Sequence, residues 1–375
     1  MKTFVRFIDW WMIAAVAVLL LAGLATMTSF QGETPFFARQ LLWVGIGTAV
    51  MLFITQSDVR FLRESRYVSA LYGVAIFLLV LVLLLGKTVK GAKSWFDLGV
   101  FSLQPTDFVK LFIVLVLAKY FTRRHIAIGQ LKHLLISALY VAIPVGLVLL
   151  QPDFGSTLII GGIWIGLALV AGIGRRHIII VAIALIVVFT ASWLFFFEPY
   201  QKARIMTFLH PTHDIRGAGY NAYQSLIAVG SGGVLGKGLG YGTQSRLNFL
   251  PEYETDFVFA AFSEEWGFVG SVIVIAAFCV LFWRLIVHAL RGRSNFETLF
   301  CAGYAIILLG HFIVNIGMNI GVMPVTGLPL PFMSYGGSHI IAEMMGMGVV
   351  LAMVRYERAI HRDDIHNEFL GYAGH

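Results

Sequence analysis

Hydrophobic residues run in long stretches along this chain, and polar residues gather in the segments between them. Runs such as VAIFLLVLVLLLG at 74–86 lack the alternation of a lipid-embedded barrel strand. A bilayer core needs about 20 apolar residues per helix, and ten stretches come near that length: 9–30, 40–56, 67–86, 107–121, 134–150, 156–174, 178–197, 257–283, 296–320 and 338–354. The pattern predicts an all-α integral membrane protein with ten transmembrane helices, in which residues 1–375 form a single polytopic membrane domain.

Composition and charge agree with this prediction. Hydrophobic residues make up 58% of the chain and charged residues 13%, and the mean hydropathy is +0.83, far above that of soluble domains. The net charge of +7 is expected to reflect topology and contact with anionic membrane lipids rather than nucleic acid. Basic residues gather in alternate loops, which are therefore expected in the cytoplasm with both termini: Lys2, Arg6, Arg60, Arg63, Arg66, Arg123, Arg124, Lys132, Arg175, Arg176, Arg284, Arg291, Arg293, Arg355, Arg358 and Arg362.

The longest polar segment, residues 198–256, is expected to be an extracytoplasmic loop between the seventh and eighth spans. It is longer than a connector between neighbouring helices requires. Inside it, GSGGVLGKGLGYG at 230–242 lacks both the spacing and the Ser or Thr of a phosphate loop. The stretch is either a flexible loop or a place where backbone amides and Lys237 approach a phosphate of a lipid-linked substrate.

Three acidic residues, Glu252, Glu254 and Asp256, stand just before the eighth predicted span in LPEYETDFVF, residues 250–259. Asp256 has two interpretations. An Asp at the start of an apolar helix is often its N-cap, whereas a carboxylate at the water boundary beside an apolar wall is also a candidate catalytic group. Spacing alone favours the cap.

Several ionisable or amide side chains fall inside predicted spans. Asp107 and Lys110 lie three residues apart on one helical face, so they can pair and offset the cost of burial. A structural ion pair is favoured over a direct catalytic role. The others are expected to line a hydrated cavity or to hold a neighbouring helix, and sequence alone assigns them no further function: Glu264, Glu265, Asn315, Asn319, His339 and Glu343.

Seven motifs in this chain resemble the SEDS family (shape, elongation, division and sporulation), whose branches are FtsW, RodA and SpoVE. They occur in the order typical of the family: GAKSWFDLG at 91, QPTDFVKL at 104, QPDFGSTL at 151, YQKARI at 200, GAGYNAYQSLIAVGSGGVLGKG at 217, LPEYETDFVFA at 250 and PVTGLPLPFMSYGGS at 324. The stretch GKGLGYGTQSRLNFLPE is more similar to the rod-shape branch, RodA, than to the division branch.

The resemblance implies a peptidoglycan glycosyltransferase that polymerises lipid II on the outer face of the bacterial cytoplasmic membrane, serving cell elongation. It implies that Asp256 is the essential carboxylate, acting as general base, and that Asp107 and Lys110 are the acidic and basic members of the family's fourth-span pair. Because a lipid pyrophosphate leaving group needs cations, not a general acid, Lys93, Lys202, Arg204 and Lys237 are expected to bind the substrate. Ser231 and Glu252 are further candidate substrate-binding residues.

The resemblance also implies a class B penicillin-binding protein as the partner that supplies the transpeptidase. No cofactor is evident, although the acidic residue Glu254 could help to recruit a divalent cation such as Mg or Mn. Three other functions remain open: a lipid II flippase or transporter, a scaffold that recruits wall enzymes, and a division-specific polymerase.

Overall fold

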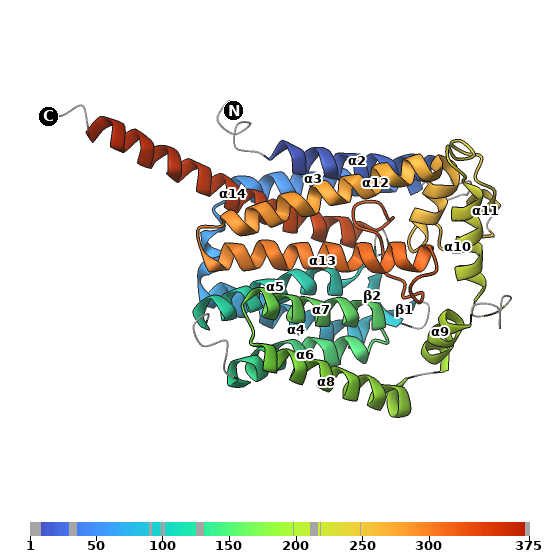
Figure 1. The fold of residues 1–375 in the computed structure, drawn as a ribbon, viewed down its shortest axis with the longest axis horizontal. Helices are drawn as coiled ribbons and strands as arrows, with labels where there is room; N and C mark the ends of the chain where they lie inside the picture. The colour runs from blue at the N-terminus through green and yellow to red at the C-terminus, as the bar shows by residue number, and fades with distance from the viewer. Residues whose placement is uncertain are drawn as a thin grey trace.

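The computed structural model describes residues 9–29, 36–89, 92–97, 99, 102–124, 131–197, 199–210, 217, 219–247 and 249–371, with the side chains of the last helix described as far as Arg355. Long helices lie side by side in one bundle (Figure 1). Its helical elements are α2 (Trp10–Thr28), α3 (Phe36–Gln56), η1 (Val59–Arg63), α4 (Ser65–Leu85), α5 (Pro105–Arg124), α6 (Leu131–Leu149), α7 (Phe154–Val170), α8 (Arg175–Ala191), η2 (Ser192–Phe196), α9 (Pro199–Leu209), α10 (Tyr220–Ser231), α11 (Thr243–Arg246), α12 (Val258–Arg291), α13 (Asn295–Asn319) and α14 (Gly337–Gly371).

Each of the ten predicted stretches coincides with one helix: α2, α3, α4, α5, α6, α7, α8, α12, α13 and α14. Within the described part of the chain, eight helical segments are long and apolar enough to cross a membrane. The two stretches outside that set fall on α5, which carries five charged residues, and on α7, which has only 17 residues. The mainly helical membrane fold is therefore confirmed. Of the basic residues used to orient it, Lys2 and Arg6 lie outside the described residues, as do the side chains of Arg124, Arg358 and Arg362.

Local signals in the sequence explain where several helices begin. Asp9 accepts hydrogen bonds from the backbone N–H groups of Trp11 (3.2 Å) and Met12 (3.4 Å) and so caps α2. Asp153 caps α7 in the same way through Ser156 N (3.0 Å). These caps supply acceptors for amide groups that have no partner inside the helix.

The helices differ in how much of their surface is buried. α14 packs mainly on α3, and α12 packs on α2 and α13. Much of α13 and of the first part of α14 is buried, whereas no residue of α8 is. The bundle therefore has a central core around α13 and α14, and α8 lies at its periphery with an apolar surface suited to lipid.

The small elements gather at one end of the bundle, opposite the end from which α14 projects (Figure 1). A three-stranded antiparallel sheet is formed by β1 (Lys87–Val89), β2 (Ala92–Asp97) and β3 (Ser102–Leu103), with Lys87 opposite Trp95 and Phe96 opposite Leu103. The segment 198–256 contributes α9, α10 and α11 to the same end. Where this segment is described, it is thus partly helical rather than a plain loop.

The glycine-rich turn after α10 packs against a kink in α12 at Gly267, which has φ +66 and ψ −160, a conformation open essentially only to glycine. A Cβ on Gly267 would lie 2.2 Å from Gly236 N. The amides of Lys237 and Gly238 donate to the carbonyl groups of Glu264 and Glu265, both at 3.0 Å. The turn therefore satisfies backbone groups that the kink removes from the helical pattern, and it is held rather than free.

Candidate active site

A cavity with a volume of about 240 Å³ opens at the end of the bundle that carries the small sheet. Most of the motifs noted in the sequence contribute to its walls. They supply Ala92, Ser94 and Trp95 from β2, Gln104 and Asp107 around the start of α5, Asp153 and Phe154 before and in α7, Gln201 and Arg204 from α9, Thr255 and Asp256 before α12, and Thr326, Gly327, Tyr335, Ser338 and His339 from the last motif and α14. Segments more than 200 residues apart in sequence thus form one site.

Asp256 lies in the wall of this cavity. Helix α12 begins at Val258, and its N-cap position is Phe257, whose side chain makes no capping hydrogen bond. The N-cap interpretation of Asp256 is therefore wrong, because the chain is still in a turn at this residue and enters the helix two residues later. Gly327 is close to the carboxylate, since a Cβ built on it would lie 3.4 Å from Asp256 Oδ2.

Two amide side chains from α13 hold the main chain at Asp256. Asn315 Nδ2 donates to Asp256 O at 2.9 Å, and Asn319 Nδ2 donates to the same oxygen at 3.1 Å. Asn319 Oδ1 also accepts from Ala260 N at 3.0 Å. Sequence analysis expected these asparagines to hold neighbouring helices, and the structure shows that they anchor the start of α12 and the turn before it.

The turn before Asp256 is closed by Glu252. Its carbonyl oxygen accepts hydrogen bonds from the amides of Thr255 (3.2 Å), Asp256 (3.1 Å) and Phe257 (3.1 Å). Its side chain accepts from Thr255 Oγ1 at 3.1 Å, and its φ of +56 is unusual for a residue other than glycine. The contacts described for Glu252 therefore shape the turn that presents Asp256.

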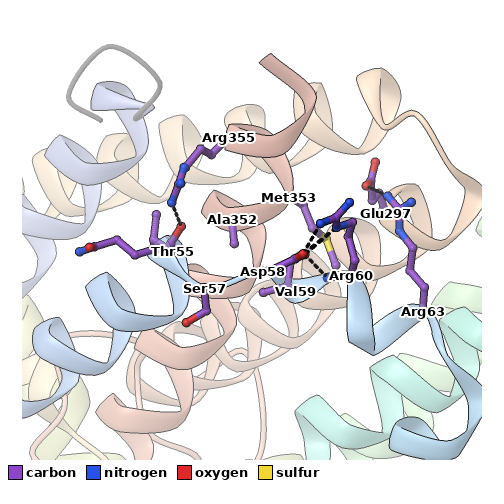
Figure 2. A pocket seen from close by; sticks show the side chains of 11 residues that line it. Thr55, Ser57, Asp58, Val59, Arg60, Arg63, Glu297, Ala352, Met353 and Arg355 are labelled. Carbon is purple, nitrogen blue, oxygen red and sulfur yellow. Dashed lines mark hydrogen bonds and ion pairs between the residues drawn. The ribbon is translucent and has the colours of Figure 1, made fainter. Parts of the chain in front are cut away.

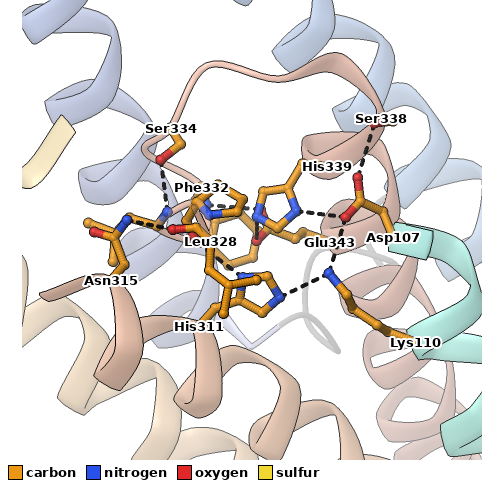
Figure 3. Close-up of polar contacts among 12 residues, drawn as sticks. Asp107, Lys110, His311, Asn315, Leu328, Phe332, Ser334, Ser338, His339 and Glu343 are labelled. Atoms are coloured by element: carbon orange, nitrogen blue, oxygen red, sulfur yellow. Dashed lines mark hydrogen bonds and ion pairs between the residues drawn. The ribbon is translucent and has the colours of Figure 1, made fainter. Parts of the chain in front are cut away.

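A buried network of charged side chains (Figure 3) reaches the cavity through Asp107 and His339. Lys110 Nζ lies 3.3 Å from Asp107 Oδ1 and 3.2 Å from His311 Nε2. His339 Nδ1 lies 3.3 Å from Asp107 Oδ1, and His339 Nε2 lies 2.8 Å from Glu343 Oε1. The predicted partners Asp107 and Lys110 thus meet inside a larger cluster that spans α5, α13 and α14.

The two histidines of this network differ in their contacts. His339 Nδ1 is within hydrogen-bond distance of Asp107 Oδ1, whereas its Nε2 lies near Glu343 Oε1 without the geometry of a hydrogen bond. His311 faces the ammonium group of Lys110 through Nε2 and the carbonyl group of Pro329 through Nδ1 at 3.1 Å, which suits a neutral ring protonated at Nδ1. Acidic and basic side chains thus lie next to one another, which offsets the cost of burying them.

The predicted cations are not brought together in the cavity. Arg204 lines it, whereas Lys93, Lys202 and Lys237 do not. Lys93 Nζ donates to Leu84 O at 3.1 Å, and Lys202 Nζ lies 5.9 Å from the centroid of the Trp193 ring. Of the four basic residues expected to bind substrate, all of which the structure describes, Arg204 is the one that borders the cavity.

Lys237 and Ser231 lie in the glycine-rich region outside the cavity. Lys237 Nζ forms a 2.6 Å ion pair with the fully buried carboxylate of Glu264 and contacts Thr243 Oγ1 at 3.0 Å. Ser231 Oγ donates to Ala228 O at 3.0 Å. These contacts hold the glycine-rich turn on α12 and give no support to phosphate binding by Lys237.

The sequence raised the expectation that an acidic residue could help to recruit a divalent cation. Asp107, Asp153 and Asp256 all border the cavity. However, no three His, Cys, Asp or Glu side chains among the described residues are grouped so that they could hold a metal ion.

A second cavity of about 190 Å³ is lined by residues from the end of α3, from η1, from the start of α13 and from the middle of α14 (Figure 2). Its acidic groups are already paired: Asp58 with Arg60, and Glu297 with Arg63. Hydrogen bonds from Arg60 lower the pKa of Asp58 to about 2, which keeps this carboxylate ionised and salt-bridged. None of the seven sequence motifs contributes to this cavity, so it is not the candidate active site.

Comparison with known proteins adds independent findings. The family described as "Cell cycle protein" (FTSW_RODA_SPOVE) matches residues 1–359. The chain is 35% identical to "Peptidoglycan glycosyltransferase MrdB" of Escherichia coli (strain K12), over 92% of this chain and 93% of that protein. It is also 35% identical to "Stage V sporulation protein E" of Bacillus subtilis (strain 168), over 91% and 93% of the two chains.

Solved structures with the same fold are also found. One, reported under "Structural coordination of polymerization and crosslinking by a peptidoglycan synthase complex", has a TM-score of 0.80 at 33% identity and covers 92% of this chain and 97% of its own. The rod shape determining protein RodA of Thermus thermophilus has a TM-score of 0.70 at 31% identity, with 92% and 96% covered.

Proposed function

Because this chain belongs to the FtsW, RodA and SpoVE family of cell cycle proteins, we propose that its 240 Å³ cavity is where lipid II is polymerised, with Asp256 as the general base. The chain is a peptidoglycan glycosyltransferase, like the relatives that carry this name. The observation that carries the assignment of Asp256 is its place in the cavity, on a turn anchored through its carbonyl oxygen by Asn315 and Asn319.

The reaction joins two sugars. The hydroxyl oxygen of one sugar forms a bond to the anomeric carbon of the other while Asp256 takes the hydroxyl proton. The bond from that carbon to the pyrophosphate oxygen breaks, and the pyrophosphate leaves with the electron pair. Attack from the side opposite the leaving group inverts the anomeric centre.

Arg204 is suited to stabilise the leaving pyrophosphate, because its guanidinium group belongs to a residue that borders the same cavity as Asp256. Guanidinium groups bind phosphate oxygens through two parallel hydrogen bonds. Charge that develops on the leaving oxygens would be stabilised more in a cavity with apolar walls than in water. Arg204 therefore takes the role expected of several cations in the sequence.

The protein is a multi-pass membrane protein, and we propose ten spans with both termini in the cytoplasm of a bacterial cell. Support comes from the ten helices that match the predicted stretches. This arrangement puts the cavity at the outer face of the inner membrane, where the sugars of a lipid-linked substrate lie outside while its tail stays in the bilayer.

A class B penicillin-binding protein is the proposed partner, and cell elongation the process served. Support for the partner comes from the fold shared with a protein of a peptidoglycan synthase complex. Support for the process comes from the similarity to RodA of Thermus thermophilus.

The decisive experiment replaces Asp256 with Asn. Asn keeps the size of the side chain but removes its basicity, so glycan polymerisation should fall by about two to four orders of magnitude. Asp256→Glu should retain only a trace, because an extra methylene misplaces the carboxylate by about 1 Å. Purified protein and its partner would be given fluorescent lipid II, and the products separated by length on a gel. An Asp256→Asn protein that makes long glycan at the wild-type rate would overturn the assignment.

A further inference from the structure

Glu343, a buried residue of α14, makes two separate side-chain contacts (Figure 3). Its Oε1 lies 2.8 Å from His339 Nε2. Its Oε2 accepts a hydrogen bond from the backbone N–H of Phe332 at 2.9 Å. Phe332 has a φ of +61, a left-handed conformation that a bulky residue adopts only when its surroundings impose it. Glu343 thus joins the buried charge network to a constrained point in the segment before α14.

The same segment also contacts the chain immediately before Asp256. Two residues beyond Phe332, Ser334 Oγ donates to Thr255 O at 2.6 Å. The next amide, Tyr335 N, donates to Glu254 O at 2.8 Å. The two carbonyl groups that accept these bonds belong to the two residues immediately before Asp256.

We propose that Glu343 and His339 are positioning residues for Asp256, acting through the segment Phe332–Tyr335. The inference rests on the proposed function of Asp256. His339 lies 3.3 Å from Asp107 Oδ1 of α5 and 2.8 Å from Glu343 Oε1 one turn further along α14, so it stands between α5 and the Glu343 carboxylate. From there the restraint passes to Phe332 and then to the two carbonyl groups before Asp256.

The position of Glu343 fits a residue that places another residue. Asp107 and His339 border the cavity, whereas Glu343 is not among its lining residues. Asp107 accepts from Lys110 and His339 on Oδ1 and from Ser338 Oγ on Oδ2 at 3.0 Å. Glu343 Oε2 is engaged by the Phe332 amide, so this carboxylate acts on the segment before α14 and not on the sugar.

Substituting Glu343 tests the proposal. Glu343→Leu removes the acceptor for the Phe332 amide, so kcat for polymerisation of fluorescent lipid II should fall about 10-fold to 100-fold, as expected for a catalytic group displaced by up to 1 Å. The KM for lipid II should stay within about 2-fold, since the cavity walls are kept. Glu343→Gln retains an acceptor oxygen for Phe332 N–H and should keep kcat within about 3-fold of wild type.

Tyr304→Phe is the matched control. The Tyr304 hydroxyl donates to the main-chain oxygen of Glu343 at 2.7 Å and is equally buried, but it takes no part in the link to Phe332. The Tyr304→Phe substitution should lower thermal stability and leave kcat unchanged. If Glu343→Leu fails to fold, Ser334→Ala tests the far end of the same link and should lower kcat with KM retained.

Three results would overturn the inference: a folded Glu343→Leu protein with wild-type kcat, equal losses of kcat in Glu343→Leu and Tyr304→Phe, or wild-type kcat in Ser334→Ala. The Asp256→Asn protein separates this outcome from failure of the proposed function. If the Asp256→Asn protein is inactive while the Glu343→Leu protein keeps wild-type kcat, only the positioning role fails. In the Asp256→Asn background, Glu343→Leu should cause no further loss.

Discussion

At the scale of single residues, the described contacts divide the expected site residues into two groups. Asp256, Arg204 and Asp107 border one cavity. Lys237 is held by Glu264, and Lys93 contacts a main-chain carbonyl group near the sheet. Residue type and motif could not distinguish these groups, because a lysine side chain is long and its partner depends on what the fold places within reach.

Arg204 and Lys202 provide a test within one helix. Arg204→Ala removes the cation that borders the cavity and should lower the initial rate of polymerisation about 100-fold, as the loss of one charged stabiliser of a leaving group does. Lys202→Ala removes a contact with Trp193 outside the cavity and should change the rate less than about 3-fold. Rates would be measured with fluorescent lipid II. Similar losses in both variants would contradict the role given to Arg204.

At the scale of elements, the kink in α12 is the place where this membrane helix contacts the glycine-rich turn after α10. Glu264 accepts bonds from the amides of Thr243 at 2.8 Å and Gln244 at 3.1 Å, and Glu265 accepts from Gly240 N at 3.0 Å. These two glutamates, which the sequence placed only within a span, therefore hold the glycine-rich turn on the helix. Gly267 makes the arrangement possible because it lets two backbones approach closely.

Gly267→Ala should destabilise the protein. Its φ and ψ would cost about 1 to 3 kcal/mol for a residue with a Cβ, and that Cβ would clash with the backbone at Gly236. We expect a lower melting temperature in detergent, measured by fluorescence-detected gel filtration. Gly161→Ala, in α7 with nothing within 4 Å of the added Cβ, should leave the temperature unchanged or raise it. Equal melting of both variants would show that the kink is not a rigid element.

At the scale of the whole molecule, orientation in the membrane decides whether the cavity meets a lipid-linked substrate outside the cell. The small sheet, α9, α10 and α11 gather at one end, and α14 projects from the other (Figure 1). Arg60 and Arg63 of η1 and Arg355 of α14 line the second cavity, next to the end of α3. The excess of basic residues there favours the cytoplasm for that end.

Cysteine labelling tests this orientation. In a protein with Cys279 and Cys301 replaced, Tyr241→Cys should react with an impermeant thiol reagent in cells whose outer membrane has been permeabilised. Arg291→Cys should react only after the inner membrane is broken. Both positions are exposed at the surface of the molecule. Labelling of Arg291→Cys in cells with an intact inner membrane would contradict the proposed topology.

The sequence by itself determined the apolar helices and the family resemblance, and through that resemblance it raised the expectation that Asp256 is the essential carboxylate. Apolar runs of bilayer length are local properties that need no knowledge of packing, and motifs are read directly along the chain. Only the tertiary structure decided that Asp256 lies in a turn and not at a helix cap, that Lys237 is paired with Glu264, and that Glu343 reaches Phe332. The physical reason is that a hydrogen bond or ion pair is set by distance in space, and packing joins residues as far apart as Ser29 and Glu265.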